Sequence, residues 1–410
     1  CRITLISIRK NIHRASRRSA RTSDFGVILC VCVRSSEISR QIPLSQRLYH
    51  IPFSVIDMYG VVLAAGRGTR MRPLTDRRPK PLLPVGDRSL LEHTFDAARD
   101  VVDEFVVVVS YRGEAIREEV GDSYRGRPVN YVQQGEPRGT AHAVAQTEPI
   151  VDDDFLVLNG DVLVDAALPR VLADADGTAI VATEVSDPRS YGVISVAGDG
   201  TLTGIVEKPA DPPTQLANVG CYAFTLRVFE YIDRTPESDR GEYEITTTLD
   251  LLLQDGCDIT VTEYDGTWLD VGRPWELLEG TETALDTIEG QRIDGTIEEN
   301  VQLNGPVVVE DDAQLKSGTY VEGPAVIREG ATIGPNAYIR GSTVVGPNVH
   351  VGHAVEVKNS VLMTGTSVGH LSYVGDSVLG RNVNIGAGTN IANLRHDDAS
   401  VRLTVKGDRV

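Results

Sequence analysis

A glycine loop directly after an apolar run is the first feature of this sequence that could do chemistry. Residues 63–75 read LAAGRGTRMRPLT, and Pro79-Lys80-Pro81 follows shortly after them. Small residues in such a loop leave backbone N–H groups exposed to an anion. Arg70 and Lys80 would supply the positive charge that the phosphates of a nucleoside triphosphate require. We therefore expect a triphosphate site here, with Arg70 and Lys80 as its catalytic cations.

Lysine usage points to the same site. Lys80 and Lys208 are the only lysines between Met58 and Gln291, although the sequence uses arginine freely. An ammonium group is a compact point charge that suits a phosphate oxygen. Both lysines are therefore expected to contact phosphate.

The glycine loop, with its GTRM and PKP segments, resembles the sugar-phosphate nucleotidyltransferase superfamily, which includes UDP-N-acetylglucosamine and dTDP-glucose pyrophosphorylases. The resemblance extends from residue 59 to about residue 275. Residues 134–142, QGEPRGTAH, are similar to the loop that reads the pyrimidine base in this family. The residues that the resemblance places at the nucleotide are Leu63, Ala65, Gly66, Gly68, Thr69, Gln134, Gly139 and Thr140.

The same resemblance implies metal-binding and sugar-binding residues further along the chain. Asp161, in Asn-Gly-Asp, and Asp270, in Trp-Leu-Asp, would be the two ligands of Mg²⁺. The segments YGV, EKP and NVG are similar to those that contact the sugar phosphate. They implicate Gly192, Glu207, Lys208 and Asn218.

The reaction that the resemblance implies explains why these residue types are needed. An oxygen of the sugar 1-phosphate attacks the α-phosphorus of the triphosphate, and pyrophosphate leaves. Because the nucleophile is already an anion, no general base is required. The site has to align two anions that repel each other and to neutralise the charge that grows between them.

A second motif with chemical potential is GHLSYVGD at residues 369–376, followed by NVNIGAGT at 382–389. The pair resembles the acetyltransferase half of bifunctional glucosamine-1-phosphate acetyltransferase / N-acetylglucosamine-1-phosphate uridyltransferases. The resemblance makes His370 the general base on the sugar amine and acetyl-CoA the acetyl donor, a role that suits the ordinary pKa of an imidazole. It assigns sugar-phosphate binding to Arg340 and Lys358, sugar contacts to Tyr373, Asn384 and Asn393, and the thioester region to Ala387.

Two departures from that family affect the second motif. Asn393-Leu394-Arg395 stands where bacterial members have Asn-Tyr-Asp, so a different sugar specificity is expected. The chain ends at Val410, where the family continues with coils that hold acetyl-CoA. We expect a C-terminally truncated sequence, which can lack the acetyltransferase activity of its parent.

The elements that must position the nucleotide site alternate between strands and helices. Buried strands are expected at residues 60–65, 105–109, 130–132, 155–158 and 179–183. Ser89 and Glu92 predict a capping box at the start of a helix, and further helices are expected at 244–254 and 275–288. This alternation predicts an α/β, Rossmann-like and mostly parallel sheet, in which ligands lie at the carboxyl ends of strands.

A strict repeat replaces this alternation after about residue 291. Apolar residues recur every six positions, which predicts a left-handed parallel β-helix of hexapeptide repeats. The residues of this row are Ile297, Leu303, Val309, Leu315, Val321, Ile327, Ile333, Ile339, Val345, Val351, Val357 and Met363. We therefore expect a nucleotidyltransferase domain at 58–290 and a β-helix, acyltransferase-like domain at 291–410. Because exposed faces of such helices commonly form trimers, a homotrimer is expected.

Composition separates the first 57 residues from the rest. The whole chain has a net charge of −18. Residues 1–57 hold ten basic and three acidic residues, whereas residues 58–410 hold 30 basic and 55 acidic ones. We interpret residues 1–57 as a disordered upstream extension and Met58 as the native start. A surface this acidic does not attract nucleic acid, and with only six lysines it suggests adaptation to high salt.

The expected compartment is the cytoplasm. No apolar run reaches the ~20 residues that span a bilayer, so no membrane partner is expected. The five cysteines contain no CxxC pair.

Three functions remain open on the sequence alone. The first is a bifunctional enzyme that acetylates glucosamine 1-phosphate and then uridylylates the product. The second is a single-activity glucose-1-phosphate thymidylyl- or uridylyltransferase with a structural β-helix, which Trp268-Leu-Asp270 favours. The third is a non-catalytic regulatory subunit, disfavoured by Lys80, Asp161 and Asp270. The sequence does not choose between UTP and dTTP, nor between hexose and hexosamine 1-phosphates.

Overall fold

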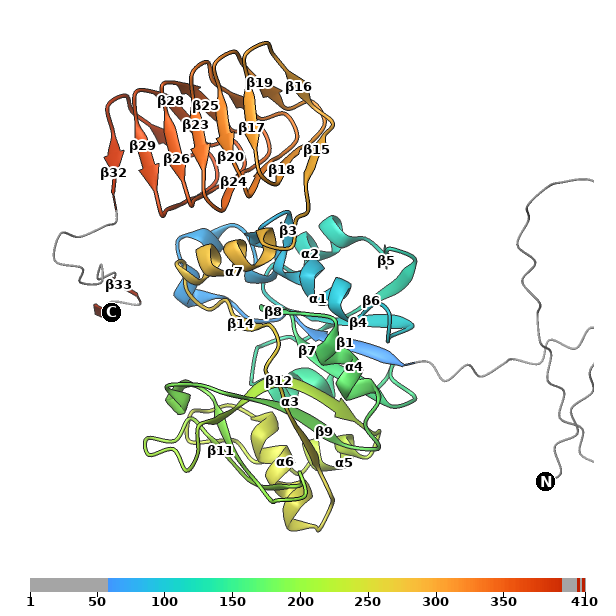
Figure 1. The fold of residues 1–410 in the computed structure, drawn as a ribbon. Helices are drawn as coiled ribbons and strands as arrows, with labels where there is room; N and C mark the ends of the chain where they lie inside the picture. The colour runs from blue at the N-terminus through green and yellow to red at the C-terminus, as the bar shows by residue number, and fades with distance from the viewer. Residues whose placement is uncertain (1–57, 393–403, 406–407, 410) are drawn as a thin grey trace, which may run out of the picture. The chain divides into compact units, whose positions relative to one another are not determined.

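The computed structural model describes residues 58–392, 404–405 and 408–409. The expectations for residues 1–57 and for Asn393 lie outside these residues. Among them an α/β sheet comes first and a stack of short strands follows, as Figure 1 shows. No helix in the described part of the chain is long and apolar enough to cross a membrane.

The sheet is built around parallel strands, as the alternating pattern predicts. β1 (Tyr59–Leu63) pairs in parallel with β4 (Glu104–Val109) and with β7 (Phe155–Asn159), and β4 pairs in parallel with β6 (Arg127–Gln133). Val61 and Val62 point to opposite faces of β1, and both are fully buried. Burial on both faces explains why this strand is an unbroken apolar run in the sequence.

Helices cover both faces of the sheet. α1 (Leu90–Ala98), α2 (Gly113–Val120) and α4 (Ala167–Ala173) pack into one apolar cluster. α3 (Thr140–Ala145), α5 (Val228–Ile232) and α6 (Ile245–Gln254) pack into the cluster on the other face. The predicted capping box is present, because the Ser89 hydroxyl accepts from Glu92 N at 3.3 Å and Ser89 N donates to Glu92 Oε2 at 2.7 Å.

The sheet becomes antiparallel beyond β7, so it is mixed. β12 (Leu216–Phe224) runs antiparallel to β7 and to β9 (Ala179–Glu184), and β10 (Gly192–Val196) forms an antiparallel hairpin with β11 (Leu202–Glu207). β13 (Thr260–Glu263) adds a parallel strand beside β9. This antiparallel arm carries the residues that the sequence assigns to the sugar.

Short elements complete the domain. They are β2 (Pro84–Val85), β3 (Arg88–Ser89), β5 (Ser123–Tyr124), β8 (Val162–Val164), β14 (Trp268–Asp270) and α7 (Glu276–Leu285), with 3₁₀ turns η1 (Thr69–Met71), η2 (Leu74–Asp76), η3 (Lys80–Leu82) and η4 (Pro188–Ser190). β14 pairs with β8, which sets Asp270 opposite Val162.

The second domain is the predicted parallel β-helix, with three sheets of parallel strands. The first sheet contains β15 (Gln291–Ile293), β18 (Val307–Val309), β21 (Ala325–Ile327), β24 (Thr343–Val345), β27 (Val361–Leu362) and β30 (Val378–Leu379). The second contains β16 (Thr296–Ile297), β19 (Gln314–Leu315), β22 (Thr332–Ile333), β25 (His350–His353), β28 (Ser367–His370) and β31 (Asn384–Ile385). The third contains β17 (Gln302–Asn304), β20 (Tyr320–Glu322), β23 (Tyr338–Arg340), β26 (Glu356–Lys358), β29 (Tyr373–Gly375) and β32 (Asn390–Ile391).

The six-residue register breaks earlier than the sequence row suggests. Arg340 pairs with Lys358, but Val344 already pairs with Val361, so one residue is lost between these two pairs. Leu362 therefore fills the core position expected for Met363, which joins a different cluster. The sequence row missed the shift because both neighbours are apolar.

One apolar cluster contains side chains of both domains. It combines Leu277 and Leu285 of α7 with Val326 and Val344, which point out of the β-helix coils. Nearby, the Arg328 guanidinium donates to the backbone oxygen of Asp87 at 2.6 Å.

Candidate active site

The glycine loop is folded tightly against the lysine that follows it. Gly68 has a φ of 57°, and a Cβ at this position would lie 2.9 Å from Lys80 Cβ and 3.0 Å from Thr75 Cγ2. The Thr75 hydroxyl donates to Gly68 O at 2.8 Å. Glycine is required here because a side chain would collide with Lys80 and would strain a left-handed residue.

Lys80 lies between the two predicted metal ligands. Its side chain is nearly buried, and Nζ donates to Asp161 Oδ2 at 2.6 Å and lies 3.7 Å from Asp270 Oδ1. Asp161 follows β7, and β14 brings Asp270 to the same end of the sheet. Burial raises the pKa of the Asp270 carboxyl, and the Asp161 carboxylate raises it further against the opposing effect of Lys80. Three residues from separate motifs thus form one cluster.

A cavity of about 240 Å³ opens beside this cluster. Its lining residues are Leu63, Ala64, Gly66, Gly68, Thr69, Arg70, Lys80, Pro81, Asp161 and Gly272. Apart from Ala64, Pro81 and Gly272, all of them were predicted from the sequence. A Cβ at Gly272 would lie 3.1 Å from Arg70 Nη2, so this glycine makes room for the guanidinium.

The donor set suits a magnesium ion shared with phosphate. Mg²⁺ is usually held by one or two carboxylates together with substrate phosphates and water. Asp161 and Asp270 lie close enough to share one ammonium group, Lys80 Nζ. The described residues contain no group of three or more His, Cys, Asp or Glu side chains able to hold a metal. The two aspartates fit a hard cation that completes its coordination with ligand oxygens.

A second segment of the chain, which contains Tyr243 and Ile245, packs against the predicted base loop. Gln134 is buried, and its amide nitrogen donates to Gly139 O at 3.3 Å and lies 2.9 Å from His142 Nδ1. Gly139 has a φ of 109°, and a Cβ there would lie 2.4 Å from the Tyr243 backbone oxygen. Ile245 N donates to the Thr140 hydroxyl at 3.0 Å. These contacts join the loop to the segment around Tyr243.

The predicted sugar residues converge on the antiparallel arm. Gly192 pairs with Glu207 across β10 and β11. A Cβ at Gly192 would lie 3.3 Å from Glu207 Oε2 and 3.5 Å from Asn218 Cβ. Asn218 is buried and donates to the Tyr222 hydroxyl at 2.8 Å. Lys208 Nζ lies 3.0 Å from Glu207 Oε1, so the lysine is paired within this group.

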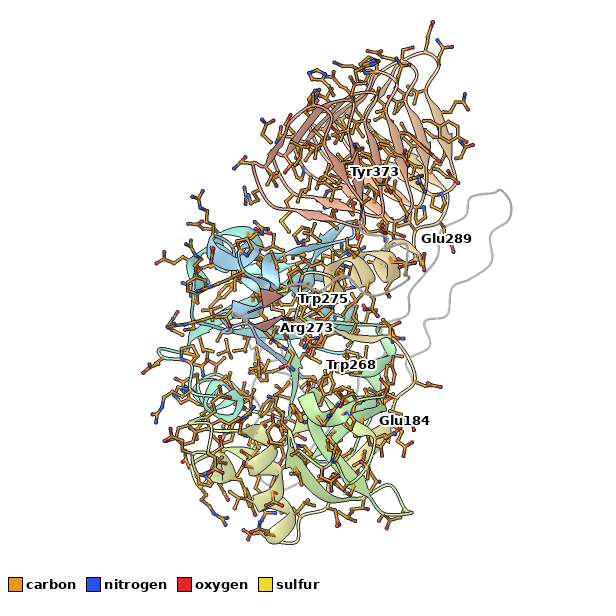
Figure 2. All side chains as sticks on the ribbon, turned by 90° about the vertical axis from the view of Figure 1, so that its left-hand side faces the viewer. Glu184, Trp268, Arg273, Trp275, Glu289 and Tyr373 are labelled. Carbon is orange, nitrogen blue, oxygen red and sulfur yellow. The ribbon has the colours of Figure 1, made fainter. Side chains whose placement is uncertain are left out.

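The aromatic rings of Trp268 and Tyr191 pack against each other. Their ring centroids are 5.4 Å apart, and Trp268 Nε1 donates to Val219 O at 3.2 Å. Figure 2 labels Trp268 below Arg273 and Trp275 in the same domain. The indole is thus fixed by packing and by a backbone bond.

Comparison with known proteins identifies the family. The nucleotidyl transferase family model matches residues 59–287, and the model described as the GMPPB C-terminal domain matches residues 321–410. The Bifunctional protein GlmU of Methanocaldococcus jannaschii is 40% identical over 354 residues, covering 86% of this chain and 85% of that protein. This chain belongs to the nucleotidyl transferase family. Its activity is that of a sugar-1-phosphate nucleotidylyltransferase.

Two further relatives agree with the family. The bifunctional sugar-1-phosphate nucleotidylyltransferase/acetyltransferase of Sulfurisphaera tokodaii is 37% identical, covering 86% of this chain and 87% of that protein. A crystal structure of a putative glucose-1-phosphate thymidylyltransferase from Bacillus anthracis matches with a TM-score of 0.52 and 28% identity, covering 57% of this chain and 97% of that one.

The structure of this nucleotidyltransferase adds residues that the sequence did not single out. Glu276 Oε2 accepts from Gly272 N at 2.6 Å and so fixes the loop beneath Arg70. Burial raises the pKa of Glu276, and nearby Asp270 raises it further. Arg240 and Thr246 both bond to Glu207. No motif spacing marks these residues. Arg240 and Thr246 contact Glu207 across 33 and 39 residues, and the local bond of Glu276 matters only because Gly272 lies beside Arg70 in the fold.

The predicted acetyltransferase residues occupy two neighbouring sheets of the β-helix. Arg340, Lys358 and Tyr373 lie on the third sheet, with Tyr373 also labelled in Figure 2. His370 and Asn384 lie on the second sheet, and both are exposed. Because just two residues separate His370 from Tyr373, the two groups meet at one corner of the coil.

Ion pairs hold the two basic residues of this corner region. Arg340 Nε donates to Glu356 Oε1 at 2.7 Å, and Lys358 Nζ donates to Asp376 Oδ2 at 3.2 Å. Ala387 is exposed on the following coil. The single chain thus presents these residues on an open surface.

Proposed function

We propose that this chain transfers a uridylyl group from UTP to N-acetylglucosamine 1-phosphate, and that its β-helix acetylates glucosamine 1-phosphate with acetyl-CoA. The observation that carries the first activity is the Lys80, Asp161 and Asp270 cluster beside the glycine loop. The names of the bifunctional relatives support the second activity. As the sequence suggests, we place the enzyme in the cytoplasm.

The nucleotidyl transfer depends on alignment and charge neutralisation. The loop at Gly66 and Gly68 holds the triphosphate, while Arg70 and Lys80 balance its charge. Glu207 and Asn218 orient the sugar, and Lys208 balances the charge of its phosphate. An oxygen of that phosphate forms the new bond to the α-phosphorus, and the bond to the β-phosphate oxygen breaks, releasing pyrophosphate.

Magnesium is the proposed metal, and Asp161 and Asp270 would hold it. When bound, Mg²⁺ supplies neutralisation of phosphate charge. Lys80 lies between these carboxylates, and its ammonium group would share with the metal the neutralisation of the phosphates of the ligand.

In the proposed acetyl transfer His370 removes a proton from the sugar amine as the amine attacks the thioester carbonyl. The new C–N bond forms, the C–S bond breaks, and CoA leaves as the thiolate, which takes a proton to become the free thiol. Arg340 and Lys358 would bind the sugar phosphate, and Tyr373, Asn384 and Asn393 the sugar. Ala387 would lie near the thioester. We further propose a homotrimer formed through the β-helix, since a neighbouring copy would cover this open surface.

A second candidate is a single-activity glucose-1-phosphate thymidylyltransferase or uridylyltransferase. The Trp268-Leu269-Asp270 strand supports it, as does the likeness to the Bacillus anthracis structure. Under this alternative His370 and Asn384 have no substrate.

A substrate panel tests the two candidates. UTP and dTTP are each offered with glucose, N-acetylglucosamine and galactosamine 1-phosphates while pyrophosphate release is followed. Acetyl-CoA consumption with glucosamine 1-phosphate is measured in parallel. Preference for UTP with N-acetylglucosamine 1-phosphate, together with thiol release, supports the proposal. Preference for glucose 1-phosphate without thiol release supports the second candidate, and no pyrophosphate release from any pair contradicts both.

A further inference from the structure

The segment 240–246 contacts both halves of the proposed substrate site. Its middle residues bond to the base loop, 134–142, and its two ends bond to the sugar-site carboxylate, Glu207. Such a segment can couple ligand binding in one half of the site to ligand binding in the other, provided that strong hydrogen bonds hold it to both halves.

The contact with the base loop is made mainly by backbone. Tyr243 N donates to Arg138 O at 2.8 Å, and Ala141 N donates to Tyr243 O at 2.9 Å. Ile245 N donates to the Thr140 hydroxyl at 3.0 Å. The Arg138 guanidinium also lies over the Tyr243 ring, 4.8 Å from its centroid. Because backbone bonds run in both directions, a displacement of the loop is expected to displace the segment as well.

The contact with the sugar site is made by side chains. Arg240 Nη2 donates to Glu207 Oε1 at 3.2 Å, and the Thr246 hydroxyl donates to Glu207 Oε2 at 3.1 Å. Both oxygens of this carboxylate are thus held by the same segment. Lys208 Nζ, 3.0 Å from Oε1, is the cation from the neighbouring strand end.

Burial of a second carboxylate anchors Arg240. The Glu244 side chain is 7% exposed, and the same Arg240 nitrogen donates to its Oε1. Burial raises the pKa of Glu244, although the bond from Arg240 opposes this shift. Removing the guanidinium from Glu244 would leave a buried charge without its cation, which is costly. Arg240 therefore stays with Glu244. The same nitrogen lies 3.8 Å from Glu242 Oε2, and its closer second contact, at 3.2 Å, fixes Glu207.

We propose that Arg240 is a positioning residue that couples nucleotide binding to sugar 1-phosphate binding. When the nucleotide base binds in the loop, it fixes segment 240–246. The segment then holds the Glu207 carboxylate in the orientation that accepts hydrogen bonds from sugar hydroxyls. The ordering cost is met by the first ligand, so the second binds more tightly, and the effect is reciprocal. This inference rests on the proposed assignment of the base loop and Glu207 to the two substrates.

Equilibrium binding without turnover tests the coupling. The affinity for N-acetylglucosamine 1-phosphate and for glucose 1-phosphate is measured by calorimetry on the full chain. Each is measured alone and at saturating α,β-methylene UTP or dTTP, which cannot release pyrophosphate. In the unmodified chain the analogue should tighten sugar binding about tenfold. In Arg240→Met this gain should fall to about twofold or less, while the affinity for the analogue alone stays unchanged.

Three variants separate positioning from other roles. Arg234→Met is the matched control, because Arg234 makes an exposed ion pair with Asp255 and should keep the full coupling. Thr246→Val removes the other bond to Glu207 and should also reduce the coupling, and it carries the test if Arg240→Met does not fold. Arg240→Lys keeps the charge without the planar fork and should restore part of it.

The outcomes are distinguishable. Unchanged coupling in both Arg240→Met and Thr246→Val overturns the inference. Sugar affinity that falls equally with and without the analogue also overturns it, because that result indicates a direct sugar contact. If the unmodified chain binds the analogues but neither sugar phosphate, the proposed sugar site fails and this inference fails with it.

Discussion

Lys80 is a nearly buried lysine whose ammonium group lies between two carboxylates, 2.6 Å from Asp161 and 3.7 Å from Asp270. In Lys80→Met the site loses the cation that we propose balances the charge of the triphosphate, and removal of one such group typically costs about 100-fold or more in rate. Pyrophosphate release should fall by this amount. Without Mg²⁺ the melting temperature should also fall, because two carboxylates are left without their cation.

Added Mg²⁺ should recover part of that loss in melting temperature. Scanning fluorimetry with and without Mg²⁺ measures it, and a coupled pyrophosphate assay measures the rate. Lys316→Met, on the β-helix, is the control and should change neither. A Lys80→Met chain that keeps more than about a third of its activity would refute the assigned role.

His370 is the residue on which the proposed second activity depends. His370→Ala should lower acetyl-CoA consumption by at least about 100-fold, as loss of a general base does. Pyrophosphate release should change by less than about twofold, because the nucleotidyl site is built from a different domain. His353→Ala is a close control, since His353 is paired with His370 on the preceding coil and is exposed. If His370→Ala also abolished pyrophosphate release, the two activities could not be independent.

At the residue scale the sequence predicted the groups that carry charge at strand ends. Lys80, Asp161 and Asp270 stand in separate short motifs, and the structure brings them within hydrogen-bond or ion-pair range. Arg240 could not be found in this way, because its partner Glu207 is 33 residues distant. Only the folded arm places the two together.

The base loop shows how one element depends on another. In Gly139→Ala the new Cβ would lie 2.4 Å from the Tyr243 backbone oxygen, at a φ of 109°. Backbone atoms cannot yield as a flexible side chain can, so the loop should separate from segment 240–246. We expect a loss of stability of about 1–3 kcal/mol and weaker nucleotide binding. Urea unfolding and nucleotide titration measure the two effects.

Gly135→Ala is the matched control for that experiment. Gly135 lies in the same loop, and a Cβ there would meet no heavy atom within 4 Å. Its stability and nucleotide affinity should stay close to those of the unmodified chain. Equal behaviour of the two variants would show that the contact with Tyr243 does not shape the loop.

The α1 helix contains a histidine that should make stability depend on pH. His93 Nε2 lies 2.8 Å from Val85 O. Burial lowers the pKa of His93 and Arg88 lowers it further, while the bond to Val85 O and the carboxylates of Asp87 and Asp96 oppose this shift. Because the unfolded chain then binds more protons, this contribution to stability is present above about pH 6.5 and is lost as the pH falls below it. In His93→Gln the loss between about pH 8 and about pH 5.5 should be smaller.

Urea unfolding at the two pH values measures this difference. His353→Gln, an exposed histidine, should keep the slope of the unmodified chain. Equal slopes in His93→Gln and the unmodified chain would show that His93 does not contribute. At this scale the sequence predicted the helix and its capping box, but not the burial of His93, which depends on the strand pair β2 and β3 packing beside α1.

Secondary structure was predicted correctly where a hydrophobic pattern or a helix cap has a direct physical cause. The parallel strands around β1 are unbroken apolar runs because both faces are buried. The antiparallel arm was not predicted, because most of its strands are not unbroken apolar runs; β11, for example, exposes Val206. The register shift at Leu362 was missed for a different reason, since Leu362 and Met363 are both apolar.

For the whole molecule, the domain order could be predicted but the contact between domains could not. Val326 and Val344 occupy outward positions of the repeat, where a polar residue would be expected. They are nevertheless buried, because they pack in a cluster with Leu277 and Leu285. Apolar residues at outward positions of neighbouring coils do indicate a covered face. The six-residue row does not include them, because it consists of inward-facing residues.

The net charge of the molecule predicts how its stability depends on salt. Residues 58–410 hold 30 basic and 55 acidic residues, so repulsion between carboxylates opposes the folded state at low salt. Salt also weakens favourable surface pairs such as Arg189 with Asp187, but an exposed pair of this kind contributes little to stability. The excess of acidic residues should therefore determine whether salt raises or lowers the melting temperature. The melting temperature should rise as KCl increases from about 0.1 M to about 2 M, over which the screening length falls to a few ångströms.

Sucrose separates screening from the general effect of excluded solutes, because it stabilises compact states without screening charge. Matched to the KCl series in osmolality, sucrose should raise the melting temperature less than KCl does. A flat KCl series, or one equal to the sucrose series, would mean that the acidic surface is not an adaptation to salt. A rise that continues above about 0.5 M, where long-range screening is already nearly complete, would indicate that the carboxylates also bind hydrated cations. That result would favour a cell interior rich in salt as the setting of this enzyme.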